Sequence, residues 1–363
     1  MSNEIVIEVF KRIDNSYKSV VVLDTFKSFS LESNYSKEDT FTLILAVDES
    51  NIKTYTADND TFLLINNKHW LFVDSVKSDD GKKLSIEGKS LLGLVKYRIN
   101  QKIYDTQATM VSKIIFDLIN NNAIGTDMKR KISVFNSIIN QDTKSSKIAY
   151  QNSYGNVLEE ISSLLDEYEL GIKETIASKK EPKVNLVIYS GIDKSKNIEF
   201  STRMENLINE QYEMNNYSES SVAYVFGEGE GTARKNVVIN NNLTDFARKE
   251  VYVDARDLQQ TTDDKTLTDA QYKEALTTRG KQKLNEDEKI LVLKGDINSH
   301  SVLFILEKDY QIGDIVKVIS AIYHLSYTTR LLGITETWDE KGYHITPQLG
   351  KESKTILDYL GGR

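Results

Sequence analysis

Glycines and carboxylates alternate in the run from Val222 to Arg234: Gly227, Glu228, Gly229, Glu230 and Gly231. A glycine-rich run can hold a phosphate, but a dinucleotide loop needs glycines at relative positions one, three and six, and position 232 is Thr. A P-loop ends in Gly-Lys-Ser/Thr, which is absent here, and the two glutamates would repel phosphate. The run therefore predicts a strand that ends in a tight turn or bulge, with glycines tolerating positive φ.

A second charged run follows at Val253-Asp-Ala-Arg-Asp257. It places Asp254, Arg256 and Asp257 where a bidentate arginine–carboxylate contact could form. Together with Arg234 and the five residues of the glycine run, these side chains form the structural motif that the sequence predicts. We expect it to fix a loop or a contact between subunits.

The other candidate sites are incomplete. Gly88-Lys-Ser90 resembles the end of a Walker loop, but position 83, where that loop needs glycine, is Lys. The four histidines are scattered singly, and no aspartate cluster completes a calcium loop. The chain has no cysteine, which excludes disulfides, thiolate zinc sites and cysteine nucleophiles. We therefore assign no catalytic, cofactor-binding or metal-binding residue and expect no enzyme activity. A dispersed Ser-His-Asp triad or glycosidase carboxylate pair has no local signature and stays open.

Length and charge limit the class of protein further. At 363 residues the chain is long enough for roughly two to four domains. No apolar run approaches the ~18–20 residues that span a bilayer, and the N-terminus lacks the features of a signal peptide. We therefore expect synthesis in a cytoplasm. The formal net charge of −8 and the short basic clusters disfavour a dedicated nucleic-acid-binding role.

Residues 1–100 are β-rich. Apolar and polar side chains alternate over residues 29–35 and 41–47, the period of half-buried strands. Strands at 62–65 and 70–73 flank Asn66-Asn67, a pair suited to a hairpin turn. A third strand and a short helix from Ser90 to Arg98 complete a predicted first β-barrel domain.

Residues 101–215 predict a smaller α+β domain. Apolar residues from Val111 to Ile119 follow helical spacing, with Thr109 or Thr106 as the candidate N-cap. A second helix covers residues 157–168, and two strands follow around Ile172 and over residues 186–189.

Residues 216–350 return to strands, with one helix over 268–285 that begins in a capping box between Thr268 and Gln271. The predicted strands cover 222–226, 236–240, 250–253, 290–293, 301–306, 315–320 and 325–338. One order of elements occurs twice, at 62–86 and at 315–346: two strands, an acidic turn that contains glycine, and a third strand. This recurrence suggests two related barrels. The predicted fold is a β-rich α+β multidomain protein in which two related β-barrel domains, 1–100 and 216–350, flank a smaller α+β insertion. A C-terminal tail covers 351–363.

The glycine run closely resembles the signature of phage tail hub proteins of the ReqiPepy-type siphovirus family, which is related to the trimeric baseplate hub of T-even phages. The resemblance extends, in the family's order, to four further blocks: Gly88–Arg98, Tyr272–Gly280, Tyr310–Val316 and Tyr343–Pro347. The resemblance reaches from about residue 85 to the end. The first eighty residues contain none of these blocks and are similar to the family only in their general character.

The resemblance implies a structural hub at the distal end of a tail tube, in which three copies bring six barrels into a ring. That ring would match a sixfold tube to a threefold tip, close or gate the DNA channel and mount a spike or fibre. The implied partners are a homotrimer, a tail tube or distal tail protein hexamer, a tape measure protein and a spike or fibre protein.

The formal net charge of −8 per chain becomes −24 in three copies, and we expect the wall of the channel to be mainly acidic and neutral. DNA would therefore pass through the ring without tight binding. Related chains often continue into a peptidoglycan-degrading domain, for which the residues beyond Gly350 leave no room. The alternatives are a cell-wall hydrolase of the tail tip and a carbohydrate-binding module that uses an exposed Trp70 or Trp338.

Overall fold

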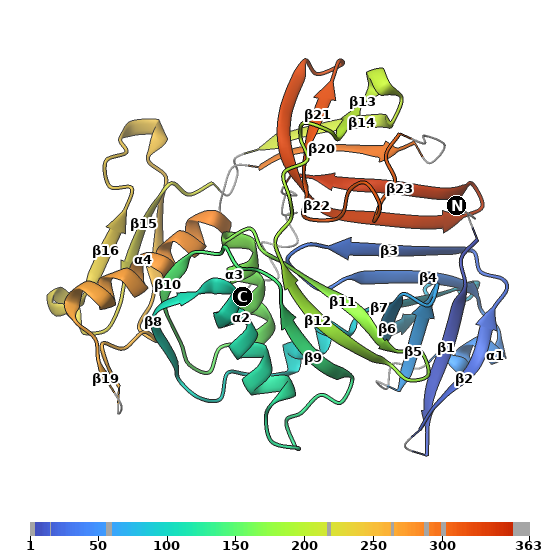
Figure 1. Cartoon of the computed structure of the whole chain (residues 1–363), viewed down its shortest axis with the longest axis horizontal. Coiled ribbons are helices and arrows are strands. Elements are labelled where there is room, and N and C mark those ends of the chain that lie inside the picture. Colours follow the sequence, from blue (N-terminus) through green and yellow to red (C-terminus); the bar gives the residue numbers. More distant parts are fainter. Residues whose placement is uncertain are drawn as a thin grey trace.

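The structure, a computed structural model, describes residues 4–14, 16–55, 60–215, 219–262, 265–286, 290–298 and 303–350. A sheet of 13 described strands runs through the molecule, and its main path is β14-β20-β23-β22-β3-β4-β7-β6-β5-β1-β2. Strands from both ends of the chain therefore belong to one sheet (Figure 1).

The N-terminal part of this sheet holds seven antiparallel strands. They are β1 (Ile7–Ile13), β2 (Ser16–Leu23), β3 (Ser28–Asn34), β4 (Thr40–Ala46), β5 (Thr61–Ile65), β6 (His69–Lys77) and β7 (Lys83–Ser90), with helix α1 (Glu49–Thr54) between β4 and β5. The predicted alternation is confirmed, since Phe29, Leu31, Phe41 and Leu43 are buried in one core on β3 and β4.

The predicted Asn66-Asn67 turn is confirmed. Both residues adopt positive φ, +50° and +57°, which asparagine tolerates better than most residues. The Lys68 N–H closes the turn by donating to the Ile65 carbonyl at 2.8 Å. The turn also binds the start of the chain, because the Asn66 N–H donates to the Val6 carbonyl at 2.9 Å.

The middle of the chain packs helices against the other face of the N-terminal strands. Its elements are η1 (Leu91–Tyr97), β8 (Tyr104–Met110), α2 (Val111–Ile119), η2 (Asn120–Ile124), β9 (Phe135–Asn140), β10 (Lys147–Asn152), α3 (Val157–Glu167), β11 (Gly171–Ser178) and β12 (Lys183–Tyr189). The apolar stripes of α2 and α3 share a core with Trp70 and Phe72 of β6. Both predicted helices are confirmed, and the short helix predicted from Ser90 to Arg98 is present as the 3-10 helix η1, with these two residues as its caps.

The predicted N-cap of α2 is wrong. Thr106 and Thr109 lie in β8, and their hydroxyls bond to each other. The first N–H groups of α2 donate to a distant loop instead: Val111 to the Ser146 carbonyl at 3.0 Å and Ser112 to the Ser145 hydroxyl at 3.2 Å. A cap that comes from 33 residues away leaves no local sequence signal.

The C-terminal strands complete the large sheet. They are β13 (Glu199–Ser201), β14 (Leu207–Asn215), β20 (Ile290–Ile297), β21 (Ile315–Ser320), β22 (Leu325–Asp339) and β23 (Gly342–Leu349), and the 3-10 helix η3 (Thr202–Met204) follows β13. The predicted recurrence is present as two antiparallel meanders, β5-β6-β7 and β21-β22-β23. Their last turns contain Gly81 at φ +64° and Gly342 at φ +111°. The strand predicted at 301–306 is wrong for residues 303–306, and residues 301–302 lie outside the described residues.

Two closed barrels are not confirmed. Among the described residues β3 pairs antiparallel with β22, from Phe29 opposite Trp338 to Asn34 opposite Gly333, so that the two strand-rich parts are continuous (Figure 1). The sheet path ends at β2 on one side and at β14 on the other, and no closed sheet is found in this part of the chain.

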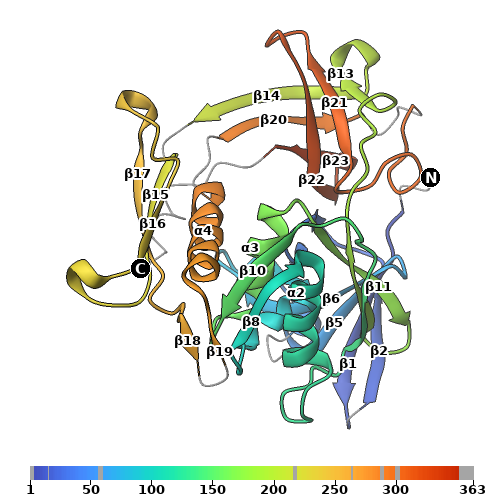
Figure 2. The same cartoon turned by 60° about the vertical axis from the view of Figure 1, so that its left-hand side comes forward.

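Residues 222–262 and 265–286 form a small separate layer. The three-stranded sheet β16-β15-β17 consists of β16 (Asn236–Ile239), β15 (Val222–Phe226) and β17 (Glu250–Asp254). Helix α4 (Asp269–Glu286) lies between this sheet and the middle of the chain (Figure 2). The capping box is confirmed, since the Thr268 and Gln271 side chains accept each other's N–H groups. The short 3-10 helices η4 (Gly231–Ala233) and η5 (Asp245–Ala247) and the strands β18 (Thr261–Thr262) and β19 (Lys265–Thr266) lie in its connections.

Tyr35, directly after β3, joins three parts of the chain. Its N–H donates to the Leu332 carbonyl of β22, and its carbonyl accepts from the Ile172 N–H of β11, both at 2.9 Å. Its hydroxyl donates to the Glu169 carbonyl at 2.9 Å and accepts from the Gly191 N–H at 3.0 Å. The residue is 1% exposed, so these groups have no access to water as a substitute partner.

The Tyr35 ring fits between two glycines. A Cβ at either Gly171 or Gly313 would lie 2.2 Å from ring atom Cε2, which is an impossible contact. The Arg330 guanidinium covers the ring at 5.5 Å from its centroid, and the Tyr189 ring meets it edge-on at 5.4 Å. The seam between β3, β11 and β22 is therefore packed around one aromatic ring.

We expect Tyr35→Phe to destabilise the whole chain. The change keeps the ring but removes the hydroxyl that bonds to the Gly191 N–H and the Glu169 carbonyl, and each lost hydrogen bond costs about 1 kcal/mol. Urea denaturation followed by tryptophan fluorescence measures this loss. Tyr154→Phe is the matched control because Tyr154 is 67% exposed, and equal stability of the two variants would contradict the importance of Tyr35.

Candidate functional site

The glycine run follows β15 and turns the chain back toward β16. Gly229 and Gly231 have positive φ, +100° and +53°, as the turn interpretation requires. Gly227 is needed for a different reason, because a Cβ there would lie 2.3 Å from the Tyr272 hydroxyl of α4. That hydroxyl accepts from the Glu228 N–H and donates to the Leu258 carbonyl, each at 2.8 Å. The run is thus fixed to α4.

The two glutamates of the run differ in role. The Glu228 carboxylate accepts from the Gln260 N–H at 3.0 Å, which ties the run to the segment after β17. Glu230 is exposed, and its carbonyl accepts from the Ala233 N–H at 3.1 Å in the turn η4.

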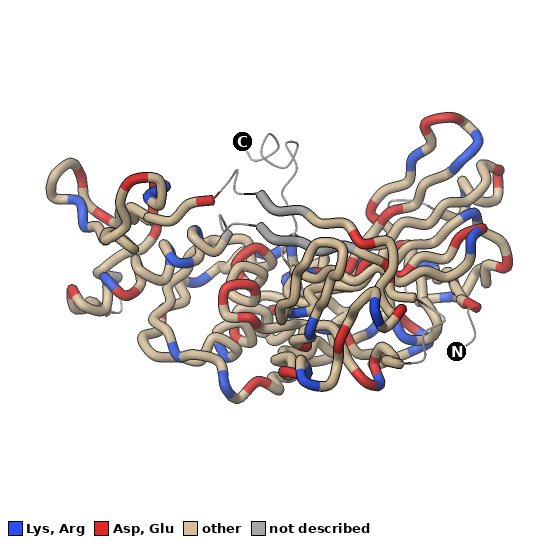
Figure 3. The backbone as a smooth tube through the Cα atoms, turned by 90° about the horizontal axis from the view of Figure 1, so that it is seen from above, with Lys and Arg blue, Asp and Glu red and all other residues tan. Residues whose placement is uncertain are grey.

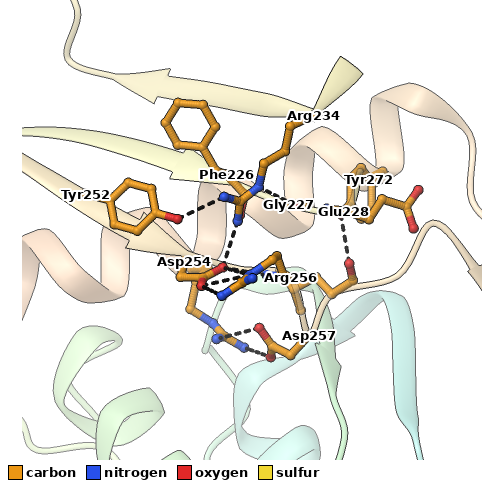
Figure 4. Close-up of polar contacts among 11 residues, drawn as sticks. Phe226, Gly227, Glu228, Arg234, Tyr252, Asp254, Arg256, Asp257 and Tyr272 are labelled. Atoms are coloured by element: carbon orange, nitrogen blue, oxygen red, sulfur yellow. Dashed lines mark hydrogen bonds and ion pairs between the residues drawn. The ribbon is translucent and has the colours of Figure 1, made fainter. Parts of the chain in front are cut away.

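Arg234 binds β15, which ends where the run begins, and β17, which pairs with β15 (Figure 4). Its guanidinium donates to the Gly227 and Phe226 carbonyls at 2.8 and 2.9 Å, and to the Tyr252 hydroxyl at 2.9 Å. It also donates to the Asp254 carboxylate of β17 at 2.7 Å. The guanidinium carbon lies 5.4 Å from the centroid of the Phe226 ring. The arginine therefore closes the loop from residue 227 to 235 onto the sheet.

Asp254 lies between two arginines. Arg256 donates to both of its carboxylate oxygens, at 2.5–3.0 Å, and Arg234 donates to one of them. Hydrogen bonds from the Arg256 side chain lower the pKa of Asp254 to about 2, with Arg234 contributing. The structure thus brings Arg234, Asp254 and Arg256 together in one cluster. The contact between Asp254 and Arg256 is the arginine–carboxylate contact that the run from Val253 to Asp257 predicted.

Asp257 belongs to a neighbouring contact. It accepts from the Arg279 guanidinium of α4 at 3.0 Å, on the side of that helix that faces α3 and β10. The Gln259 N–H donates to the Gln151 side chain of β10 at 2.8 Å, and Thr278 of α4 bonds to the Ala149 carbonyl at 3.4 Å. The contacts of Gln259 and Thr278 attach the small layer to the middle of the chain, whereas the pair of Asp257 and Arg279 lies within that layer.

Sequence reasoning missed Tyr272, Arg279 and Tyr252 as members of this site. Tyr272 and Arg279 are seven residues apart and therefore lie on one side of α4, which was a usable signal beside the charged run at 254–257. Tyr252 alternates with buried Val253 on β17 and points to the outer face, where the strand pattern alone does not indicate a partner.

This arrangement holds the loop from residue 227 to 235 against the sheet. The Arg234 guanidinium is engaged by the chain itself, and no group of three His, Asp or Glu residues with metal-binding geometry exists among the residues that the structure describes. The expectation of an exposed tryptophan is wrong. Trp70 is 0% exposed and donates to the Ser178 carbonyl, and Trp338 is 9% exposed. No described helix is long and apolar enough to span a bilayer.

We expect Arg234→Met to loosen the loop from residue 227 to 235. The Arg234 side chain is 16% exposed, so loss of its bonds to two carbonyls and a carboxylate costs about 2 kcal/mol or more. Hydrogen exchange of the Glu228 and Lys235 amides measures the loosening. Arg256→Met removes the other arginine of Asp254 and is the control, because at 68% exposure its pair contributes at most about 1 kcal/mol. Equal exchange in both variants would refute the bracing role.

Comparison with known proteins places the whole chain in one group. A family model described as siphovirus ReqiPepy6 Gp37-like protein matches residues 6–351. A tail protein from Neisseria meningitidis has a similar structure, with a TM-score of 0.59 and 13% identity over 96% of this chain and 97% of that one. The 43 kDa tail protein of prophage MuSo2 from Shewanella oneidensis has a TM-score of 0.56 and 11% identity over 94% of this chain and 98% of that one. A prophage tail protein from Listeria monocytogenes has a TM-score of 0.53 and 14% identity over 98% of this chain and 97% of that one. The search among curated proteins returned no significant match.

Proposed function

Because the chain belongs to the siphovirus ReqiPepy6 Gp37-like family, we propose that it is the structural hub at the distal end of a phage or phage-like tail tube. It is a phage tail protein with a structural role in the virion. The observation that carries the proposal is the family match over residues 6–351. The shared fold over nearly the full length of three tail proteins supports it. We expect no catalytic activity.

In the proposed assembly three copies form a ring that adapts a sixfold tube to a threefold tip. Each chain contributes two strand-rich parts, 1–100 and the C-terminal strands, so that three chains present six similar surfaces. The recurrence of the antiparallel meander in both parts supports this pairing. A closing head-to-tail contact between copies is the usual way to build such a ring.

The free edges of the large sheet are our candidates for the contact between copies. β2 pairs only with β1, and β14 pairs only with β20, in the described sheet. On β2 the side chains of Val20 and Val22 are 41% and 59% exposed. An open edge with exposed β-branched residues promotes aggregation unless another chain covers it. We propose that the next copy of the ring does so.

The proposed partners follow from this position. A tail tube or distal tail protein hexamer lies above the ring, a tape measure protein ends at it, and a spike or fibre protein is mounted below. The ring closes or gates the channel until DNA passes. Assembly takes place in the host cytoplasm, and the mature protein lies at the virion tail tip.

We expect the double variant Val20→Lys, Val22→Lys to fold but to fail in ring formation, because charge on the β2 edge prevents edge pairing. Mass photometry of the assembled protein, or the mass of recovered tail tips, distinguishes trimers from single chains. Met128→Lys is the control, since Met128 is 94% exposed in the loop after η2. A trimeric double variant would exclude β2 as the interface, and a wild-type complex of six copies or one would refute the trimer.

We also expect the assembled ring to bind DNA weakly. Basic and acidic residues are interspersed along the described backbone in the view from above (Figure 3). A channel with a mainly acidic and neutral wall keeps a polyanion mobile. Fluorescence anisotropy with a short duplex at low salt should show no tight binding. Tight, salt-sensitive binding would contradict an acidic lumen.

A further inference from the structure

Three segments in the middle of the chain form one surface, which we call the three-loop surface. They are 97–103 at the end of η1, 127–131 between η2 and β9, and 153–156 between β10 and α3. The Asn100 N–H donates to the Gly155 carbonyl, and the Tyr154 N–H donates to the Asn100 carbonyl, both at 2.9 Å. The Arg130 guanidinium donates to the Ile99 carbonyl at 2.6 Å. These bonds join the three segments side by side.

The three-loop surface is basic, although the chain has a formal net charge of −8. Its charged side chains are one acid, Asp127, and five bases, Arg98, Lys102, Lys129, Arg130 and Lys131. None of the five bases forms an ion pair within 4 Å among the described residues, whereas Lys96, directly before the surface, pairs with Asp74 at 3.1 Å. The Asp127 carboxylate accepts from the Lys129 and Arg130 N–H groups at 3.0 and 3.2 Å and thereby closes its own turn. The positive charge of this surface is not balanced within the described chain.

Two of the bases lie close together and are partly buried. Arg98 donates to the Arg130 and Tyr97 carbonyls at 2.6 and 3.0 Å. Arg130 donates to the Ile99 carbonyl and to the Gln101 side chain at 2.6 and 2.9 Å. Burial and the neighbouring charge of Arg130 lower the pKa of Arg98. The two guanidinium groups are therefore fixed by neutral acceptors, and a carboxylate from outside the chain would offset their repulsion.

Large apolar side chains are exposed among these bases. Tyr97, Ile99 and Ile103 are each about half exposed, and Tyr154 is 67% exposed. Tyrosine and arginine are enriched in protein–protein interfaces, and apolar groups with a polar rim mark such sites. The composition of the surface is thus that of an interface with another protein.

Tyr154 provides an independent sign of a partner. Its φ of +59° lies in the left-handed region, where a bulky residue is strained. The bond from its N–H to the Asn100 carbonyl holds the backbone in this conformation. Among the described residues the Tyr154 side chain makes no hydrogen bond and no contact with another ring. The strained backbone therefore presents an aromatic ring to the solvent, and no contact within the described chain compensates the strain.

A cavity of about 530 Å³ lies at the same surface. Among the side chains that line it are two bases, two amides and one acid: Lys102, Arg130, Gln101, Asn121 and Asp127. The bases and amides offer N–H donors to a carboxylate that enters the cavity. The surface thus has a hollow beside its apolar side chains.

We propose that the three-loop surface binds another protein of the tail, one that presents carboxylates around an apolar centre. Complementary charge would orient this partner, and the exposed rings would pack against its apolar side chains. DNA fits less well, because Ile99 and Ile103 add nothing to contacts with phosphate. A second copy cannot place its own three-loop surface here, since like charges repel. The inference rests on the tail role of the chain and is independent of the hub and of the trimer.

Photocrosslinking in purified tails tests the inference. Tyr154 is replaced by p-benzoylphenylalanine, which keeps an aromatic ring at this position, and the crosslinked peptides are identified by mass spectrometry. We expect a segment of a different tail protein with net negative charge and apolar side chains. The double variant Lys129→Glu, Lys131→Glu should lower the crosslink yield about tenfold, because it places like charge against the partner. Lys179→Glu, Lys180→Glu is the matched control, with the same change of charge at exposed lysines between β11 and β12, and should leave the yield unchanged.

Tyr154→Asn separates binding from folding. Asparagine tolerates positive φ better than tyrosine, so the free energy of unfolding in urea should stay equal or rise. With the crosslinker at Tyr97 instead, the same variant should lower the crosslink yield, because the exposed ring is lost.

Several results would overturn the inference: crosslinks to a second copy or to DNA, no crosslink in tails that contain the chain, equal yields in the two lysine variants, or a less stable Tyr154→Asn protein. Tails that lack the chain would refute the tail role itself, on which the inference rests.

Discussion

The burial of one tyrosine at the meeting point of three chain segments is the constraint on which the rest of the structure depends. Tyr35 uses its N–H, its carbonyl and its hydroxyl in the seam between β3, β11 and β22. Because a buried polar group without a partner costs about 1–3 kcal/mol, the three segments must keep one relative position to satisfy all these bonds together. The glycines that contact the ring, Gly171 and Gly313, could not be replaced without moving it.

The attachment of the small layer has a different physical basis. The N-terminal and C-terminal strands are joined by a backbone ladder between β3 and β22. The sheet of β15 to β17 has its own core with α4, and side chains such as Thr278 and Gln151 connect it to the middle of the chain. A backbone ladder is cooperative, whereas such side-chain contacts can be lost singly. The large sheet therefore forms the rigid frame, and the small layer is the part whose position depends on individual side chains.

The sequence allowed prediction of what is local. Apolar periodicity located α2, α3, α4 and most strands, and Asn66-Asn67, Gly81 and Gly342 marked turns because their backbone needs positive φ. The contact between Asp254 and Arg256 was also predictable, since the residues are two apart. Arg234 joins the same carboxylate from twenty residues away, and only the pairing of β15 with β16 and β17 explains that meeting.

What could not be predicted depends on contacts between distant segments. No periodicity reveals that β3 pairs with β22 about 300 residues later, because the pattern of a strand indicates which face is buried and not which strand lies beside it. The capping of α2 by Ser145 and Ser146 could not be predicted for the same reason. The placement of Asp39 and Glu174 is the strongest case. Each acid looks like an ordinary surface residue in the sequence, yet both line one cavity in the fold. Burial there raises the pKa of Glu174 to about 8, with Asp39 contributing. The bond between the Tyr35 carbonyl and the Ile172 N–H, which helps to hold the frame together, thus also joins the two segments that carry these acids.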